Sequence, residues 1–572
     1  MNKKQIVDQL ETIALYLEIE GENPFKIAAY RRAGQALERD RRSMAQITDL
    51  GSIRGIGKGT AQVIGELMAT GESSVLKELQ KKIPASLPEL LKIPGLGGKK
   101  IGKLYQALGV KDSETLRTVC EKGLVRNLPG FGKKTEEKIL KAINEQDNRP
   151  VQLSIAYMTD LAEKIEAELA QIHVIRRFSR AGSLRRAKEY MKDLDFVLET
   201  EVPEETADRI LESLDVFEVS GRGERKMTVL LDDPFHVSVD FRFAKPEAFV
   251  TTLHHFTGSK EHNVLLRHLA KERGEKISEY GVESGNGSLL TFSSEADFYH
   301  HFGLHEIPPE VREGTVEVER AARAPLGLLK LSDIKGDLHM HSTWSDGSYT
   351  VQEMADAMRA KGYEYACLTD HSRSLRVAGG LTEYQLMKQL EEVERINAQY
   401  NDFRIFSGVE MDILPDGRLD YPDDILKSLD FVIASIHSSF SQTREAIMKR
   451  LEIACLNPYV RLIAHPTGRM PGRRKGYAVD VDRLIELAQV TGTALELNAS
   501  RYRLDLSSKW VNKAQAAGVK IAINTDSHSL KMIDDMTLGV QTAIRGWVRP
   551  GTVLNTLSRK AFEHFLKKGK NL

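Results

Sequence analysis

Seven short apolar runs recur in the chain after residue 333, and nearly every run ends in a residue that can bind a metal. Amphipathic stretches with helical periodicity separate the runs, at 350–361, 384–397, 443–456 and 480–491. Strands that alternate with helices form parallel β-α units, and a closed barrel of such units carries its functional groups at the carboxyl ends of its strands. The pattern therefore predicts a seven-stranded β/α barrel with a site on that face.

Histidines mark this face of the predicted barrel. Of the seven histidines after residue 333, six end an apolar run and only His564 does not. The sixth run, 494–498, has no histidine. The candidate metal ligands are His339, His341, Asp346, His371, Glu410, His437, His465, Asp526 and His528. A lone histidine is more often a hydrogen-bonded structural residue, but nine candidates on one face favour a shared metal centre. Nitrogen and carboxylate ligands without thiolates favour Mn²⁺, Zn²⁺ or Fe over Mg²⁺.

A second acidic group lies nearer the middle of the chain. Asp193 and Asp195 are two residues apart in a strand-like run, so their carboxylates share a face. Asp240 ends the alternating run 236–240, which we expect to form a neighbouring strand. Adjacent carboxylates repel each other unless a cation lies between them, and hard oxygen ligands suit Mg²⁺ or Mn²⁺.

A phosphate-binding turn is expected just upstream of these carboxylates. Gly182 and Ser183 lie at a predicted turn into a helix, where free backbone N–H groups can hold a phosphate, and Arg186 adds positive charge. Three carboxylates, two metals and a phosphate cradle suit in-line phosphoryl or nucleotidyl transfer.

These residues resemble the palm of family X DNA polymerases, typified by DNA polymerase beta, in the order Gly-Ser, Arg-Arg, Asp-x-Asp and a distant third Asp. The segment 255–259, His-Phe-Thr-Gly-Ser, is similar to the family's Tyr-Phe-Thr-Gly-Ser segment that contacts the sugar. The resemblance implies that Asp193, Asp195 and Asp240 bind two Mg²⁺ or Mn²⁺ ions. It also implies that Asp240 activates the primer 3′-hydroxyl.

The same resemblance implies a site for a dNTP. Its residues would be Gly182, Ser183, Arg186, His255, Phe256, Gly258 and Asn263, with Arg267 contacting the template DNA. His255 stands where the family has tyrosine, which leaves the discrimination between deoxyribose and ribose open. The segment 276–281 is similar to the family's thumb, and it implies an ion pair between Glu279 and Arg242 that closes the site.

The front of the chain is basic. Residues 1–150 hold 26 Lys and Arg against 19 Asp and Glu, a net charge of +7 in a chain whose total is zero, which suggests an anionic partner. A Gly-apolar-Gly turn occurs three times there, each before a helix start that bears lysine, and this repeat resembles the helix-hairpin-helix module. Glycine lets a DNA phosphate approach the backbone N–H groups. The residues concerned are Gly55, Gly57, Gly95, Gly97, Gly130 and Gly132, with Lys58 beside the first turn.

Residues 1–80 also resemble the amino-terminal lyase domain of DNA polymerase beta. Lys26, Tyr30 and Arg31 match its first DNA-contacting helix. Removal of a sugar phosphate needs an amine that forms a Schiff base, but Val63 occupies the aligned position and Gly59 replaces another lysine. We expect this region to bind DNA without that lyase mechanism, with Lys58 left open as a substitute amine.

The ligand set of the barrel resembles the PHP domain, a seven-stranded barrel with a trinuclear metal centre. This resemblance implies that all nine candidates hold three metals, Mn²⁺, Zn²⁺ or Fe, and that Asp346 is a position where related members vary. Bound metals would supply a hydroxide nucleophile near neutral pH. The family implies 3′–5′ exonuclease activity, with abasic-site cleavage or clean-up of blocked 3′ ends as further activities.

A family X polymerase followed by a PHP barrel is the layout of bacterial and archaeal PolX repair polymerases. We therefore expect a multidomain chain: an all-α helix-hairpin-helix region, an α+β palm and thumb with the nucleotidyltransferase fold, and a (β/α)7 PHP barrel. The expected boundaries are 1–80, 81–150, 151–250 (palm), 251–315 (thumb), 316–334 (linker) and 335–572 (barrel). The expected partners are gapped or primer-template DNA and dNTPs.

The setting follows from what the sequence lacks. No run approaches the roughly 20 apolar residues of a membrane span, and the start has no signal-peptide core. Cys120, Cys367 and Cys455 are scattered and offer neither a disulfide framework nor a thiolate metal site. We expect a monomeric, cytoplasmic protein that does not contact membranes.

Two alternatives remain at this stage. In one, the barrel is a phosphoesterase for small molecules and the front half, with an inactive or minor polymerase, only tethers it to DNA. In the other, the protein is a non-enzymatic scaffold for DNA ends and the barrel metals are structural.

Overall fold

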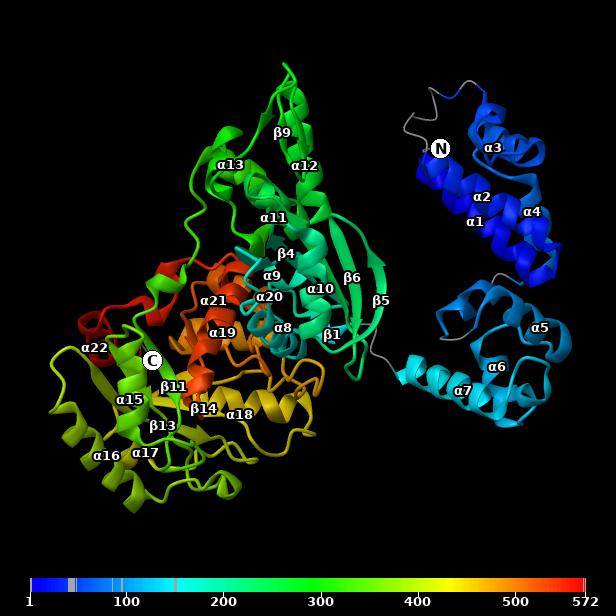
Figure 1. Ribbon diagram of the computed structural model, residues 1–572. Coiled ribbons are helices and arrows are strands. Elements are labelled where there is room, and N and C mark those ends of the chain that lie inside the picture. The colour runs from blue at the N-terminus through cyan, green and yellow to red at the C-terminus, as the bar shows by residue number, and fades with distance from the viewer. Residues whose placement is uncertain are drawn as a thin grey trace. The chain divides into compact units, whose positions relative to one another are not determined.

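The computed structural model describes residues 3–39, 47, 49–84, 86–93, 96–148, 152–568 and 570. Gly95, one of the expected DNA contacts, lies outside these residues. The chain forms two compact units, 1–150 and 151–572, which we treat separately (Figure 1). Among the described helices, none combines the length and apolar character that a membrane span needs.

The first unit is all-helical, as the repeats predict, and its apolar side chains form one continuous core from Ile6 to Ile143. Its helices are α1 (Lys3–Glu20), α2 (Pro24–Arg39), α3 (Lys58–Thr70), α4 (Ser74–Lys82), α5 (Gly98–Leu108), α6 (Ser113–Glu121) and α7 (Lys133–Asn148). Short 3-10 turns precede three of them: η2 (Leu50–Ser52), η3 (Leu87–Lys92) and η4 (Val125–Asn127).

The three Gly-apolar-Gly turns share one backbone pattern. The apolar residues Ile56, Leu96 and Phe131 are buried, at 7%, 5% and 8% exposed. The backbone N–H of each donates to the carbonyl three residues earlier, at 3.0–3.1 Å. The glycine that follows is exposed in every copy and begins the next helix. Burial of the middle residue therefore pins each turn and leaves the second glycine at the surface.

The palm of the second unit is a five-stranded mixed sheet in the order β2-β4-β7-β6-β5. Its strands are β2 (Arg177–Arg180), β4 (Asp193–Glu199), β5 (Val216–Arg222), β6 (Lys226–Leu231) and β7 (Ser238–Ala244), with helices α8 (Ile155–Leu169), α9 (Gly182–Arg185) and α10 (Pro203–Ser213). The small strands β1 (Leu153–Ser154) and β3 (Tyr190–Met191) pair beside it. Strands β4 and β7 are parallel, and their register sets Asp195 opposite Asp240.

The thumb follows the palm, and its elements project away from the barrel (Figure 1). It contains α11 (Phe249–Thr257), α12 (Lys260–Glu272), β8 (Lys276–Ser278), β9 (Gly281–Glu283), β10 (Leu289–Leu290) and α13 (Glu295–His301). A connecting segment with helix α14 (Glu317–Arg323) then leads to the barrel.

The seven predicted strands are present, parallel and paired in sequence order from β11 to β17. They are β11 (Gly336–Met340), β12 (Tyr365–Leu368), β13 (Arg404–Asp412), β14 (Phe431–Ser435), β15 (Val460–Ile463), β16 (Ala494–Asn498) and β17 (Ile521–Asn524). Met340 and Ser527 form a parallel bridge that brings β11 back beside β17, and the His341 N–H donates to the Ser527 carbonyl at 2.9 Å. The sheet is thus nearly closed, as the (β/α)7 prediction requires.

Helices lie on the outside of these strands (Figure 1). They are α15 (Val351–Ala360), α16 (Glu383–Asn397), α17 (Asp423–Leu426), α18 (Arg444–Leu456), α19 (Val481–Thr491), α20 (Ser508–Ala516), α21 (Met536–Arg545) and α22 (Arg559–Lys567). Four of them match the amphipathic stretches read from the sequence to within one residue at each end.

The palm and the barrel pack directly on each other. Leu504 and Leu538 of the barrel belong to the apolar core of the palm. Arg501 of the barrel, 9% exposed at its side chain, bonds to Asp160 of α8 at 2.7 Å, and Arg469 pairs with Glu189 at 2.7 Å. The candidate site of the palm and that of the barrel therefore belong to one continuous body.

The close packing of α5 on α1 gives a stability prediction. A Cβ at Gly102 would lie 2.4 Å from the Ile19 carbonyl oxygen, so Gly102→Ala should lower the free energy of unfolding by about 1–3 kcal/mol. Gly65 in α3 is the matched control, because a Cβ there meets nothing within 4 Å and helix propensity should raise stability by about 0.5–1 kcal/mol. Urea unfolding with hydrogen exchange of α1 and α5 measures both. Equal effects of the two substitutions would contradict this packing.

Two candidate metal centres

The aspartates of the palm come together through the pairing of β4 and β7. Asp193 and Asp195 lie on one face of β4, and Asp195 is opposite Asp240 on β7. Gly182 lies against them with a φ of +56°, and a Cβ there would be 2.0 Å from Asp195 Oδ2. Only glycine fits this position, because both the space and the left-handed backbone exclude a side chain.

Burial and the charges of neighbouring carboxylates raise the pKa values of Asp193 and Asp195. The pKa of Asp195 rises to about 7 because of burial first and then of the charges of Asp193 and Asp240. The pKa of Asp193 is raised by burial and by Asp240. Carboxyls in such a setting gain more than ordinary surface aspartates from a bound cation.

Asp240 has partners of its own. Thr228 Oγ1 donates to Asp240 Oδ1 at 2.7 Å, and Asp240 Oδ2 lies 2.8 Å from Lys226 Nζ and 3.3 Å from Arg242. In each ligand group of the barrel the candidate atoms lie within 4.8 Å of one another, but the three palm aspartates form no such group among the described residues. Asp240 must exchange Lys226 and Arg242 for a metal if the three are to share one.

The expected ion pair between Glu279 and Arg242 is absent from the part of the chain that the structure describes, so that expectation is wrong for this conformation. Arg242 instead bonds to Asp240 and lies 4.1 Å over the ring of Phe256. The reason is local: Asp240 and Arg242 are two residues apart on one strand and share a face, so the nearest carboxylate is already beside the guanidinium.

A cavity of about 400 Å³ opens beside Asp193 and Asp195. All seven residues expected to hold the nucleotide line it, together with Arg267. The lining also includes Ser259 and Lys260, which sequence reasoning did not single out. The signal for Lys260 was its place directly after the Thr-Gly-Ser segment.

Two side chains of this cavity are held in place. Arg186 donates to the Thr257 carbonyl, and burial lowers its pKa. Asn263 Nδ2 donates to the His255 carbonyl at 2.8 Å, while its buried Oδ1 has no partner among the described residues. Burial lowers the pKa of His255 as well, although the charge of Glu279 opposes it, and this favours the neutral ring at this wall of the cavity.

The nine candidate ligands of the barrel converge on Glu410. Its carboxylate oxygens lie 2.7 Å from His465, 3.0 Å from His371, 3.3 Å from His339 and His437, and 3.5 Å from His341. The remaining candidates adjoin this set: Asp526 is 3.1 Å from His341, and Asp346 is 3.3 Å from His528. Three overlapping groups result, which share His341, His371 and Glu410.

The pKa values of the residues in this cluster shift in opposite directions. Burial raises the pKa of Glu410, but the rings of His437, His371 and His339 outweigh it and hold that pKa well below its usual range. Burial and the neighbouring His528 and His371 lower the pKa of His341 to about 3, so its ring is neutral and can act as a ligand. For His437 the charge of Glu410 outweighs burial and raises the pKa to about 10.

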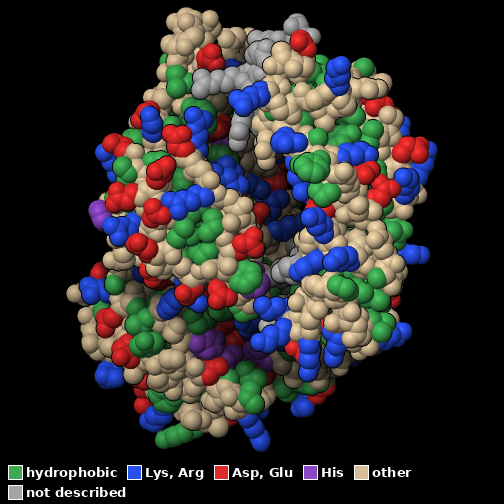
Figure 2. Space-filling model, turned by 45° about the vertical axis from the view of Figure 1, so that its right-hand side comes forward, with side chains coloured by type: hydrophobic (Ala, Val, Ile, Leu, Met, Phe, Trp, Pro, Cys, Tyr) green, Lys and Arg blue, Asp and Glu red, His purple; other side chains and the backbone are tan. Residues whose placement is uncertain are grey.

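Metal ions fit this donor set. His339 Nε2, His341 Nδ1, His371 Nδ1, His465 Nδ1 and Glu410 Oε2 are buried and have no hydrogen-bond partner within the described part of the chain. Buried polar atoms are seldom left without a partner, and a ligand that approaches them explains the exception. His437 and His528 keep 13% and 28% side-chain exposure, and histidines gather in one hollow of the surface in Figure 2.

The expected DNA contacts of the first unit differ in how open their backbone is to a ligand. A Cβ at Gly57, Gly97 or Gly132 would meet nothing within 4 Å, so their backbone is open to a ligand. Gly55 and Gly130 have positive φ angles, of +113° and +92°, and shape the turns. Lys58 starts α3 at the surface.

On α2, Lys26 pairs with Glu22 and Arg31 with Glu11 and Glu18, so both cations already have surface partners. Tyr30 is only 7% exposed and belongs to the helical core. Little of its side chain is therefore accessible for a DNA contact in this structure, because α2 turns that face onto its neighbours. Val63, at the position of the lyase amine, is buried at 5% exposure.

Known proteins are similar to the whole chain and to its separate parts. The chain is 53% identical over 569 residues, 99% of its length and 100% of the relative, to the Bacillus subtilis protein described as DNA polymerase/3′-5′ exonuclease PolX. The chain belongs to the PolX family.

Family models match the parts of this PolX chain one by one. A helix-hairpin-helix domain covers residues 1–73 and a SAM-like helix-hairpin-helix tandem covers 87–145. The DNA polymerase beta thumb covers 252–313, and the PHP domain covers 337–500.

More distant relatives match only a part of the chain, of about the length of the barrel. A probable phosphatase of Acetivibrio thermocellus is 31% identical over 205 residues, 34% of the chain and 78% of that protein. A probable phosphatase of Caldicellulosiruptor bescii is 28% identical over 240 residues, 40% of the chain and 95% of that protein.

Two carboxylates that were not identified in the sequence, Glu496 and Asp412, contact candidate ligand histidines of this PolX barrel. Glu496 accepts from the His465 N–H at 2.6 Å and from Asn524 at 2.9 Å, and it lies 2.8 Å from His339 Nδ1. Asp412 lies 3.0 Å from His437 Nδ1. Carboxylates of this kind orient ligand histidines. Glu496 lies in the middle of the sixth run, 494–498, which has no histidine, and a carboxylate inside an apolar run was the available signal.

Glu496→Gln should therefore weaken Mn²⁺ binding to the barrel by about 10- to 100-fold, because His339 loses the carboxylate that orients its ring. Mn²⁺ titration followed by electron paramagnetic resonance measures this affinity. Glu391→Gln, at a surface pair with Lys388 on α16, is the matched control and should bind as the wild type does. Unchanged Mn²⁺ affinity in Glu496→Gln would contradict the orienting role.

Proposed function

We propose that this chain fills short gaps in DNA by adding dNTPs at the palm and removes nucleotides from 3′ ends at the barrel. Abasic-site cleavage and clean-up of blocked 3′ ends belong to the same proposal. The observation that carries it is the presence, on one body, of a cavity lined by Asp193 and Asp195 and a separate histidine-rich cluster. Full-length similarity to a protein described as a polymerase and 3′-5′ exonuclease supports it.

At the palm, Asp193, Asp195 and Asp240 would hold two Mg²⁺ or Mn²⁺ ions, which supply charge neutralisation for in-line nucleotidyl transfer. Gly182 and Ser183 present backbone N–H groups to the phosphates, and Arg186 adds a fixed positive charge. Asp240 accepts the proton of the primer 3′-hydroxyl once Lys226 and Arg242 release it. His255 and Phe256 bound the sugar side of the same cavity.

At the barrel, the nine candidate residues would hold three ions of Mn²⁺, Zn²⁺ or Fe, which supply a hydroxide near neutral pH. Low pKa values keep Glu410 and Asp526 charged and His341 neutral, and these are the states that bind metal. His437 and His528, at the exposed rim, are the members that a scissile phosphate meets first.

The first unit holds gapped or primer-template DNA by its backbone. Exposed N–H groups at Gly97 and Gly132 would bond phosphates without reading the sequence. The Gly57 N–H donates to Thr60 Oγ1 at 3.0 Å, so a phosphate at the first turn would have to displace that bond or use the N–H groups of the helix start that follows. The buried Val63 supports the absence of a Schiff-base lyase, and Lys58 is the one amine nearby that could substitute. A monomer working in a reducing cytoplasm fits the three free, buried cysteines.

A DNA-tethered phosphoesterase is the second candidate. It is favoured by one observation: relatives named probable phosphatases match only 34% and 40% of the chain, a length close to that of the barrel. The scaffold alternative has no observation of this kind.

Two variants separate these readings. Asp193→Asn should reduce primer extension on a gapped duplex by about 10³-fold or more, because one ligand of the palm metals is lost, and should leave metal-dependent degradation of single-stranded DNA intact. His339→Ala should do the reverse. A gapped duplex with Mn²⁺, with and without dNTPs, reports both activities. Extension that survives Asp193→Asn would overturn the polymerase assignment, and degradation that survives His339→Ala would overturn the nuclease assignment.

The backbone contacts have their own test. The triple variant Gly57→Ala, Gly97→Ala and Gly132→Ala should keep its thermal stability, because each Cβ points into open space. Its affinity for gapped DNA should fall by about tenfold or more, because the methyl groups stand between phosphates and N–H groups. Fluorescence anisotropy with labelled duplex measures it. Wild-type affinity at equal salt would contradict phosphate contacts at these turns.

A further inference from the structure

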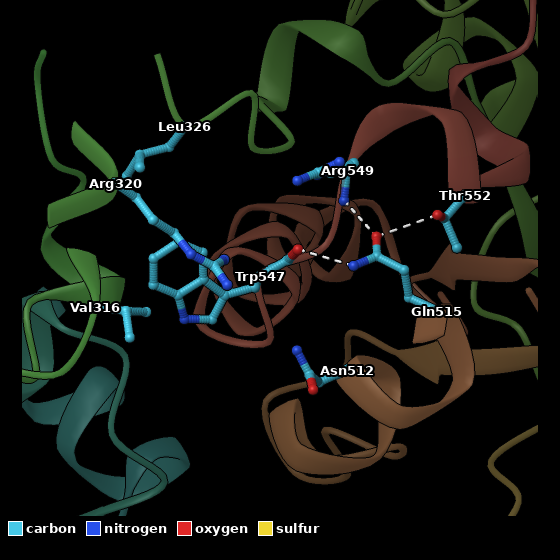
Figure 3. A pocket seen from close by; sticks show the side chains of 8 residues that line it. All are labelled: Val316, Arg320, Leu326, Asn512, Gln515, Trp547, Arg549 and Thr552. Atoms are coloured by element: carbon cyan, nitrogen blue, oxygen red, sulfur yellow. Dashed lines mark hydrogen bonds between the residues drawn. The ribbon is translucent and has the colours of Figure 1, made fainter. Parts of the chain in front are cut away.

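A second cavity, of about 470 Å³, lies at the seam between the connecting segment and the barrel. Figure 3 shows Arg320 and the Trp547 indole side by side at one end of it and Gln515 at the other, with Arg549 above and Asn512 below. It shares no residue with the palm cavity or with the nine barrel candidates. Pockets for small ligands commonly have this size and lie between domains.

The cavity carries uncompensated positive charge. Neither the Arg320 nor the Arg549 guanidinium has a carboxylate partner among the described residues, although Arg323, one turn further along α14, pairs with Glu319. Most arginines at the other seams are paired, as Arg501 and Arg469 are. Two free planar guanidiniums at one cavity suit a phosphate, which accepts from them in bidentate fashion.

An aromatic ring lies beside this charge. The Arg320 guanidinium is 4.8 Å from the Trp547 ring centroid. Trp547 has a φ of +59°, a left-handed conformation that is unfavourable for a bulky side chain. The backbone N–H of Trp547 donates to the Ile544 carbonyl at 2.8 Å. The turn that ends α21 therefore fixes this conformation and holds the indole at the cavity.

The floor is fixed by hydrogen bonds. Gln515 Nε2 donates to the Trp547 carbonyl at 3.0 Å, and its Oε1 accepts from the Arg549 N–H at 2.7 Å and from Thr552 at 3.1 Å (Figure 3). Asn512 Nδ2 donates to the Gly546 carbonyl at 2.9 Å, which leaves its Oδ1 as an acceptor without a partner in the described part of the chain. The cavity thus offers donors for an anion, one acceptor and a π-face.

We propose that this seam cavity binds a nucleotide, with its phosphate at Arg320 and Arg549 and its base against Trp547. Aromatic rings bind any nucleobase by stacking, and arginine adds to the interaction. Such a site goes beyond the two centres proposed above. The nucleotide is either free or part of a single DNA strand, and the two sources share this chemistry. Because the lining comes from both sides of the seam, the bound nucleotide would tie the connecting segment to the barrel.

The test uses the full chain with Trp344→Phe and Trp510→Phe, which leaves Trp547 as the single tryptophan. Its emission is followed with EDTA present during titration with dAMP, with a single-stranded oligo(dA) or with inorganic phosphate. We expect a saturable change with dAMP or oligo(dA), and the stronger of the two identifies the source. In the double variant Arg320→Gln and Arg549→Gln, the dissociation constant should rise by about tenfold or more.

Arg323→Gln in the same background is the matched control, since it removes a neighbouring charge that is already paired, and its titration should match the parent. The proposal is overturned if neither nucleotide ligand changes the emission saturably, or if the double variant binds as tightly as the parent. It is also overturned if inorganic phosphate binds as tightly as the better nucleotide ligand, because the base would then contribute nothing.

Discussion

Carboxylates held close to other ionisable side chains shape both candidate centres. At the palm, burial and two neighbouring charges raise the pKa of Asp195 to about 7. At the barrel, Glu410 lies within 3.5 Å of five imidazole rings. Each arrangement is costly without a cation or a proton to balance it. Parallel strands make both arrangements possible, because they bring residues distant in sequence to the same edge.

The union of palm and barrel gives these two centres a fixed relation. Leu504 and Leu538 complete the palm core, and Arg501 ties α8 to the loop that follows β16. The palm therefore has no complete core without the barrel. An enzyme that trims a 3′ end and then extends it gains from such a body, since the second step needs no search for a new partner.

Local periodicity explains how much the sequence could reveal. The two-residue spacing of Asp193 and Asp195 and the strand-end histidines follow from rules that hold for any strand or barrel. The helices of the barrel were predicted to within a residue because their apolar faces repeat with helical spacing. The lining of the palm cavity came from a family resemblance, and the structure brings all of those residues to one cavity.

Tertiary neighbours explain what could not be predicted. Arg242 has two carboxylates within reach in principle, and only the fold decides that Asp240 is the nearer. Tyr30 was matched to a DNA-contacting helix, and only the packing of α2 against its neighbours shows that its side chain belongs to the helical core. Glu496 and Asp412 act through histidines that are distant in sequence, so no spacing rule points to them. Trp547 owes its position to a left-handed turn that its residue type gives no reason to expect.

Anomalous diffraction from crystals grown with Mn²⁺ and a gapped duplex would test the central claim most directly. The account predicts peaks in two places: one bounded by Asp193, Asp195 and Asp240, with Asp240 withdrawn from Lys226 and Arg242, and a cluster enclosed by Glu410 and the barrel histidines. Asp240 still bonded to both cations, with no metal at the palm, would contradict it.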